Sequence, residues 1–186
     1  GRIAVVPRGV DTDLFSPARR SAALRHRWGV TERQLAVVTV GRIAAEKNLD
    51  EAIRSFRALQ ATHPDARLVM VGDGPLRASL EQAHPDVLFA GMQQGTTLAE
   101  HYASADLFLF PSRTETFGNV TLEAMASGLP VVAFDDAAAA MHIRHRASGM
   151  LVPNVGPSRF ADAACELARD ATLRRRLGAA ARSYVE

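Results

Sequence analysis

The amino-acid sequence predicts an α/β fold in which helices cover both faces of an open, doubly wound parallel sheet. Two observations support this fold class. Short runs rich in valine, leucine and phenylalanine are apolar almost throughout, which is typical of strands buried on both faces. Amphipathic segments separate these runs, and this alternation of strand and helix indicates right-handed βαβ crossovers. We expect one domain over residues 1–186.

Six runs are expected to be strands because each is short, apolar and rich in β-branched or aromatic residues. They are RIAVV (2–6), LAVVTV (35–40), ARLVMV (66–71), VLFA (87–90), DLFLF (106–110) and PVVAF (130–134). Segments with apolar residues at helical spacing predict helices over 49–62, 75–83, 97–105, 119–128, 158–170 and 171–186. Asn119 is a candidate N-cap, and Gly128 is placed to end the same helix.

Composition narrows the class of protein. With 47% hydrophobic and 23% charged residues, the chain is expected to be soluble and globular. The net charge is only +2 and aromatics make up 6%, so no basic stripe with stacking platforms is present and nucleic acid is not an expected partner. No apolar run reaches the roughly 18 residues of a spanning helix. The chain starts without methionine, in a strand-like run, so we expect it to be part of a longer protein.

Unusual residues follow the expected strands. GRIAAEKN, GDGP, GMQQG and PSRTETFGN each come directly after one of four strands. Ligands of open parallel sheets bind beyond the carboxyl ends of the strands. Glycines, two separated basic residues and two glutamates therefore gather on one rim, which we predict to be the functional site.

The basic residues on this rim are Arg42 and Lys47. Arg42 follows its strand after one residue and Lys47 lies at the approach to the next helix, so both can converge on an anion near that helix N-terminus. A diphosphate suits such a pair, and with both charges in place no metal ion is expected. The alternative is two solvated cations in a polar loop.

The two glutamates are Glu115, in the loop, and Glu123, one turn inside the helix. Carboxylates beside a phosphate repel it, so they are better suited to accept hydrogen bonds from sugar hydroxyls. The backbone N–H groups of Phe117, Gly118 and Asn119 would point from the helix N-terminus toward phosphate. The alternative is an acidic helix start that complements the dipole, which leaves the loop glutamate unexplained.

These residues carry a family resemblance that spans nearly the whole chain. VVPRGVDTDLFSP, VGRIAAEKN, VGDGP and PSRTETFGNVTLEAMASGLPVVA resemble the carboxyl-terminal domain of retaining GT-B glycosyltransferases, family 4 or group 1. The resemblance implies a Rossmann-like donor-binding domain whose amino-terminal acceptor domain is absent. It implies transfer of a sugar from a UDP- or GDP-sugar to an acceptor glycan, lipid or small molecule, with retention and without metal or other cofactor. It further implies a cytoplasmic location, with peripheral contact at the inner face of the membrane.

The resemblance also implies residue roles. Arg42 and Lys47 would hold the diphosphate and, with Glu115 on the transferred sugar, form the catalytic set. Glu123 would hold the ribose. The remaining donor-binding residues would be Gly41, Gly72, Gly74, Arg77, Met92, Phe117, Gly118, Asn119 and Val120, of which Gly72, Gly74, Arg77 and Met92 would lie near the base.

The sequence departs from the family where a glycine pair and a glutamate often follow the last strand, because it reads DDAAAAMHIRHRASGMLV there. Two other functions stay open: a nucleotide-sugar epimerase on a similar scaffold, and a non-catalytic nucleotide-binding module. The isolated domain is expected to bind nucleotide weakly and to lack transferase activity. Asp11 and Asp13 mimic a metal-binding pattern but are interpreted as turn formers.

Overall fold

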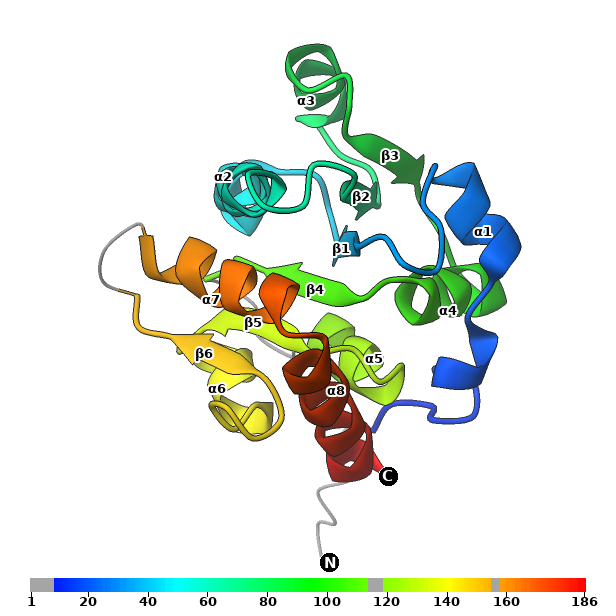
Figure 1. The fold of residues 1–186 in the computed structure, drawn as a ribbon, viewed down its shortest axis with the longest axis vertical. Coiled ribbons are helices and arrows are strands. Elements are labelled where there is room, and N and C mark those ends of the chain that lie inside the picture. Colours follow the sequence, from blue (N-terminus) through cyan, green and yellow to red (C-terminus); the bar gives the residue numbers. More distant parts are fainter. Residues whose placement is uncertain (1–8, 114–118, 155–157) are drawn as a thin grey trace, which may run out of the picture.

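The computed structural model describes residues 9–113, 119–154 and 158–186. Within them, a six-stranded sheet has the order β3-β2-β1-β4-β5-β6, and every neighbouring pair is parallel (Figure 1). The strands are β1 (Ala36–Val40), β2 (Arg67–Val71), β3 (Leu88–Gly91), β4 (Leu107–Phe110), β5 (Val131–Phe134) and β6 (Met150–Val152). The predicted parallel sheet is confirmed, and its first five strands each begin one residue after the predicted start. The predicted strand 2–6 lies outside the described residues.

Strand β6 is absent from the sequence prediction. It has only three residues and pairs with β5 through Met150, Leu151 and Val152 at the edge of the sheet. Three apolar residues cannot establish a period by themselves. The pairing with β5 therefore defines this strand, not its local sequence.

The helices are α1 (Ala22–Arg27), α2 (Leu49–Gln60), α3 (Arg77–Ala83), α4 (Gly95–Ser104), α5 (Asn119–Ala126), α6 (Ala137–His142), α7 (Ser158–Arg169) and α8 (Ala171–Val185). Two short 3-10 turns, η1 (Pro17–Arg19) and η2 (Ala45–Lys47), precede α1 and α2. The six predicted helices are present, while α1 and α6, of six residues each, were not predicted. Short helices give too few turns for a periodic signal.

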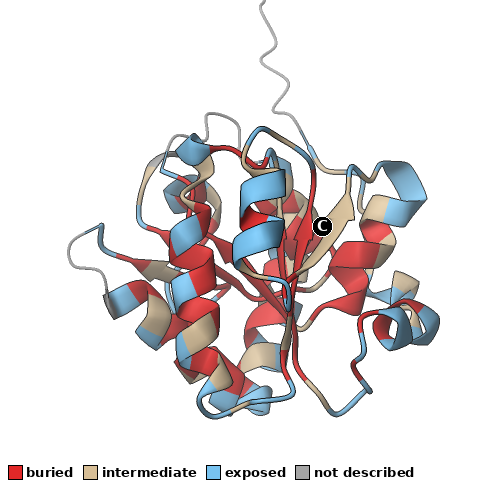
Figure 2. Cartoon of the chain, turned by 90° about the horizontal axis from the view of Figure 1, so that it is seen from above, coloured by how far each residue is buried: buried red, intermediate tan, exposed pale blue. Residues whose placement is uncertain are grey.

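Helices lie on both faces of the sheet, as predicted. Side chains of α2, α3 and α7 share one apolar core, and those of α1, α4, α5 and α6 share the other. Strand residues alternate between the cores, so that Leu107 and Leu109 enter the first and Phe108 and Phe110 the second. Figure 2 shows the buried strands between helices whose outer faces are exposed. Burial on both faces explains why the strands are almost wholly apolar.

Arg182, near the end of α8, fixes the segment that precedes η1. Its Nη1 donates to the carbonyl oxygens of Thr12 at 2.9 Å, Phe15 at 2.7 Å and Ala126 at 2.7 Å. One guanidinium thus satisfies three carbonyls from two parts of the chain. It holds residues 9–16 beside α5.

Candidate functional site

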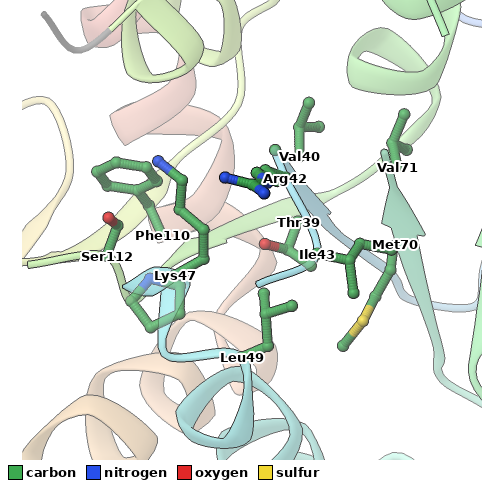
Figure 3. A pocket seen from close by; sticks show the side chains of 12 residues that line it. Thr39, Val40, Arg42, Ile43, Lys47, Leu49, Met70, Val71, Phe110 and Ser112 are labelled. Atoms are coloured by element: carbon green, nitrogen blue, oxygen red, sulfur yellow. The ribbon is translucent and has the colours of Figure 1, made fainter. Parts of the chain in front are cut away.

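The candidate site lies where the order of the strands reverses, between β1 and β4. β1 and β4 are neighbours, and the chain leaves β1 toward β2 but leaves β4 toward β5. The loops after these two strands diverge, and such a switch point is where open α/β sheets bind ligands. A pocket opens here, lined by Gly41, Arg42, Lys47 and Ser112 among others (Figure 3). We call it the switch-point pocket.

Glycines allow the loops after β1 and β2 to pack against each other. A Cβ on Gly72 would collide with the carbonyl oxygen of Gly41, and a Cβ on Gly74 with that of Ile43. The close approach permits hydrogen bonds from Gly41 N to Val71 O at 3.0 Å and from Ile43 N to Asp73 O at 2.9 Å. The packing of these two loops therefore explains why positions 72 and 74 are glycines. Their contact with a base stays a prediction.

The predicted cations Arg42 and Lys47 both line the switch-point pocket. Figure 3 shows the guanidinium of Arg42 and the amino group of Lys47 on the same side of this pocket. The Arg42 side chain is 67% exposed, and its Nη1 lies 3.7 Å from Oε1 of Glu46. An exposed ion pair of this length is weak, so Arg42 can turn to an incoming anion at little cost.

The chain geometry around Lys47 joins the two loops of the pocket. Lys47 ends η2, and Asn48, with a φ of 51°, turns the chain into α2. Nδ2 of Asn48 donates to the carbonyl oxygen of Pro111 at 3.3 Å. This bond ties the loop after β1 to the loop after β4, and the neighbouring residues Lys47 and Ser112 line the same pocket.

Ser112 belongs to the pocket although sequence reasoning missed it. It is the second residue after the end of β4 and is 6% exposed. Within the described residues its Oγ has no hydrogen-bond partner. The available signal was a hydroxyl residue at the carboxyl end of a central, fully buried strand.

Glu123 lies in a different pocket from the two cations. It shares this hollow with Asn119 and Leu122 of α5 and with Asp11 and Phe15 of the preceding segment. Tyr102 of α4 donates its hydroxyl to Oε2 of Glu123 at 2.9 Å. Burial raises the pKa of the Glu123 carboxyl above its usual value, and the hydrogen bond from Tyr102 partly opposes that rise.

The remaining predicted residues are spread along the same rim. Arg77 begins α3, and hydrogen bonds to Glu81 at 2.8 Å and Asp73 at 3.0 Å raise the pKa of its guanidinium. Met92 follows β3 and is 62% exposed. Val120 packs partly against the core. Glu115, Phe117 and Gly118 lie outside the described residues, so their roles stay predictions.

The aspartates after the first expected strand act as predicted. The Oδ1 atom of Asp11 accepts hydrogen bonds from the backbone N–H groups of Asp13 at 3.0 Å and Leu14 at 2.9 Å. This is an Asx-type turn. Within 9–113, 119–154 and 158–186, no three His, Cys, Asp or Glu side chains are arranged to hold a metal ion.

Known proteins share sequence patterns with most of this chain. Residues 34–170 match the family model described as Glycosyl transferases group 1. Over 180 residues the chain is 41% identical to a GDP-mannose-dependent alpha-mannosyltransferase of Mycobacterium tuberculosis, covering 96% of this chain and 45% of that relative. The chain thus spans about half the length of this curated relative.

Solved structures show the same fold. The C-terminal domain of a glycosyl transferase group 1 family protein (LpcC) from Francisella tularensis superposes with a TM-score of 0.83 at 25% identity, over 95% of this chain and 96% of that one. Anabaena Alr3699/HepE in complex with UDP and glucose gives a TM-score of 0.80 at 24% identity, over 95% of this chain and 50% of that one. The resemblance noted in the sequence is confirmed.

Proposed function

Because the chain belongs to the Glycosyl transferases group 1 family, we propose that it is the donor-binding half of a retaining glycosyltransferase. Its donor is a GDP- or UDP-sugar, and the name of the mycobacterial relative supports a GDP-sugar. One observation carries the proposal: Arg42 and Lys47, five residues apart in sequence, line one pocket at the switch point of the sheet. Two cations on a rim that binds ligands suit a diphosphate.

The cations would act on the leaving group. As the bond between the sugar and the diphosphate breaks, negative charge develops on the departing oxygen. Once the donor is bound, Arg42 and Lys47 would already contact the diphosphate before that charge forms, and groups placed in this way lower a barrier. The acceptor attacks on the leaving-group face, through an oxocarbenium-like transition state, and the anomeric configuration is retained. Two protein cations would replace a metal ion in this role, and Glu115 would hold the transferred sugar.

Glu123 would hold the ribose. Its carboxylate is already oriented by Tyr102 and lies in a hollow beside the rim. An ionised carboxylate accepts two hydrogen bonds from neighbouring hydroxyls, as the 2′ and 3′ positions of a ribose offer. A carboxyl held in place before binding loses little side-chain freedom when the nucleotide arrives.

The acceptor would bind through a second domain, beyond the part of the protein that this chain represents. Glycan, lipid and small-molecule acceptors all fit a donor half of this kind. A lipid acceptor would bring the enzyme to the inner face of the membrane from the cytoplasm. In the part of the chain that the structure describes, no helix is long and apolar enough to cross a bilayer.

Calorimetric titration of the chain with GDP, UDP and ADP, with magnesium or with EDTA, tests the proposal. We expect one diphosphate to bind equally well in EDTA, and Lys47→Ala to weaken it at least tenfold. The matched control is Arg176→Ala, which removes a charge from an exposed position of α8. If Lys47→Ala and Arg176→Ala bind alike, the diphosphate site is wrong.

A second experiment separates transfer from the two other functions. The full-length protein is incubated with a radiolabelled nucleotide-sugar, with and without acceptor extract. Label in the acceptor fraction indicates transfer, whereas an epimerised donor formed without acceptor indicates the epimerase. A binding module would consume no donor at all.

A further inference from the structure

Ser112 presents an unusual combination of burial and missing hydrogen bonding. It is 6% exposed, and its Oγ has no hydrogen-bond partner among the described residues. A buried hydroxyl that is removed from water without a partner costs free energy. An alanine at this position would avoid that cost. The serine therefore calls for a partner that the described residues do not supply.

The surroundings of Ser112 indicate where the partner comes from. The side chain lines the switch-point pocket, whose walls include the apolar side chains of Met70, Val71 and Phe110 (Figure 3). None of these three can accept a hydrogen bond from a hydroxyl well. The neighbouring carbonyl of Pro111 accepts a hydrogen bond from Asn48 at 3.3 Å, and none from the Ser112 hydroxyl. The partner is therefore best supplied by a molecule that enters the pocket.

The charges of the pocket indicate what that molecule is. Arg42 and Lys47 line the same pocket and select an anion. A serine hydroxyl adds no charge but donates one directional hydrogen bond, and such bonds are stronger when the acceptor is ionised. Two long cations attract an anion from several directions, whereas a buried hydroxyl on a fixed strand end contacts it from one direction only.

We propose that the Ser112 hydroxyl donates a hydrogen bond to a phosphate oxygen of the nucleoside diphosphate held between Arg42 and Lys47. This inference rests on the proposed function of the pocket. Ser112 fixes the rotation of the diphosphate, while the two cations supply most of the attraction. The ligand in turn supplies the missing partner of the buried hydroxyl.

The chain offers a matched control. Ser127 is 4% exposed, and its Oγ likewise has no partner within the described part of the chain. It lines a different hollow, with Arg20, Gly128 and Pro130, at the end of α5. Pro130 directly precedes β5, so this hollow adjoins the amino end of a strand, whereas Ser112 lies beyond the carboxyl end of β4. Both serines are buried and lack a partner among the described residues, but Ser112 shares its pocket with Arg42 and Lys47, whereas Ser127 does not.

The test measures ligand affinity and stability for the wild-type chain, Ser112→Ala and Ser127→Ala. GDP and UDP are titrated by calorimetry, and unfolding midpoints in urea are recorded without ligand. We expect Ser112→Ala to weaken the bound diphosphate about tenfold, the effect of losing a hydrogen bond to a charged group. Its urea midpoint is expected to be equal to or above that of the wild type. Ser127→Ala is expected to leave the affinity unchanged.

Three results would overturn the proposal. The first is an affinity for GDP and UDP that is unchanged in Ser112→Ala. The second is a lower urea midpoint in Ser112→Ala, which would mean that the hydroxyl has a structural partner. The third is weaker binding of the nucleotide-sugar alone, with unchanged binding of the diphosphate, which would place the hydroxyl on the sugar.

Lys47→Ala, measured in parallel, separates this inference from the proposed function. If Lys47→Ala weakens the diphosphate and Ser112→Ala does not, only the role of Ser112 fails. If the wild-type chain binds neither GDP nor UDP, or if Lys47→Ala has no effect, the diphosphate pocket itself fails and the role of Ser112 fails with it.

Discussion

The hydroxyl of Tyr102 donates a hydrogen bond to Oε2 of Glu123 across 2.9 Å, joining α4 to α5. Tyr102 is fully buried, and its ring lies edge-on to Phe15 with centroids 5.8 Å apart. The hydroxyl therefore has a fixed position, and it holds the carboxylate that would contact the ribose. Tyr102 is therefore expected to act through Glu123, as a positioning residue.

Tyr102→Phe removes this hydroxyl and keeps the ring. We expect nucleotide affinity to fall several-fold because the Glu123 carboxylate loses its orientation, and stability to fall by about 1 kcal/mol. Calorimetry and urea unfolding measure the two effects. Tyr184→Phe is the control, since among the described residues that exposed side chain's hydroxyl makes only a 3.4 Å contact with the Met141 carbonyl. Equal affinities in the two variants would contradict the positioning role.

Glu123 is expected to make nucleotide binding and stability depend on pH in opposite directions. Burial raises the pKa of its carboxyl above the ordinary value, so the folded chain holds this proton more tightly than the unfolded chain. The contribution of Glu123 to stability is therefore fully present below the unfolded pKa and is lost as the pH rises through the folded pKa. Nucleotide binding, which needs the ionised carboxylate, is expected to strengthen over the same rise.

Glu123→Gln tests this dependence. The variant cannot ionise, so its stability relative to the wild type should increase as the pH rises above the ordinary glutamate range and then level off. Its nucleotide affinity should lack the corresponding rise. Both are measured by titrating affinity and urea midpoints across the acidic range. Asp11, which lines the same hollow, is replaced by asparagine in a separate variant, and a pH response that moves with Asp11 would refute the assignment.

Arg42 is expected to serve binding and not stability. Its side chain is 67% exposed and its ion pair with Glu46 spans 3.7 Å. Arg42→Ala should therefore change the free energy of unfolding by no more than about 0.5 kcal/mol, while weakening the diphosphate at least tenfold. Glu46→Gln, which removes the competing carboxylate, should tighten binding slightly. A large loss of stability in Arg42→Ala would instead make the arginine structural.

Gly74 is expected to control the shape of the pocket through packing. A Cβ there would strike the backbone of Ile43, which cannot move aside as a flexible side chain would. Gly74→Ala should lower stability by several kcal/mol, on the scale of overpacked sites. Gly95→Ala is the matched control, because its φ of 53° carries only the left-handed penalty and no atom lies within 4 Å of the added Cβ. That variant should lose about 1 kcal/mol. Equal losses would show that the loops after β1 and β2 can separate easily.

The family resemblance implies donor-binding roles for Glu115, Phe117 and Gly118. These residues lie outside the described part of the chain, so the roles stay predictions. Arg42 and Lys47 were predicted to converge, and the structure brings them into one pocket. Glu123, predicted on the same rim, lines a neighbouring hollow with Asn119, and its role stays a prediction. Ser112 was not predicted, because a serine after a strand is common and its burial cannot be read from local sequence.

The sequence by itself determined the fold class and the rim. Apolar runs and helical periods record which faces of a segment are buried, and each needs only neighbouring residues to be recognised. The tertiary structure alone decided the three-residue strand β6, the pairing of Tyr102 with Glu123 and the need for glycine at 72 and 74. Each depends on segments far apart in sequence that the order of the strands brings together. Local patterns carry no information about such partners, because the sheet creates these contacts.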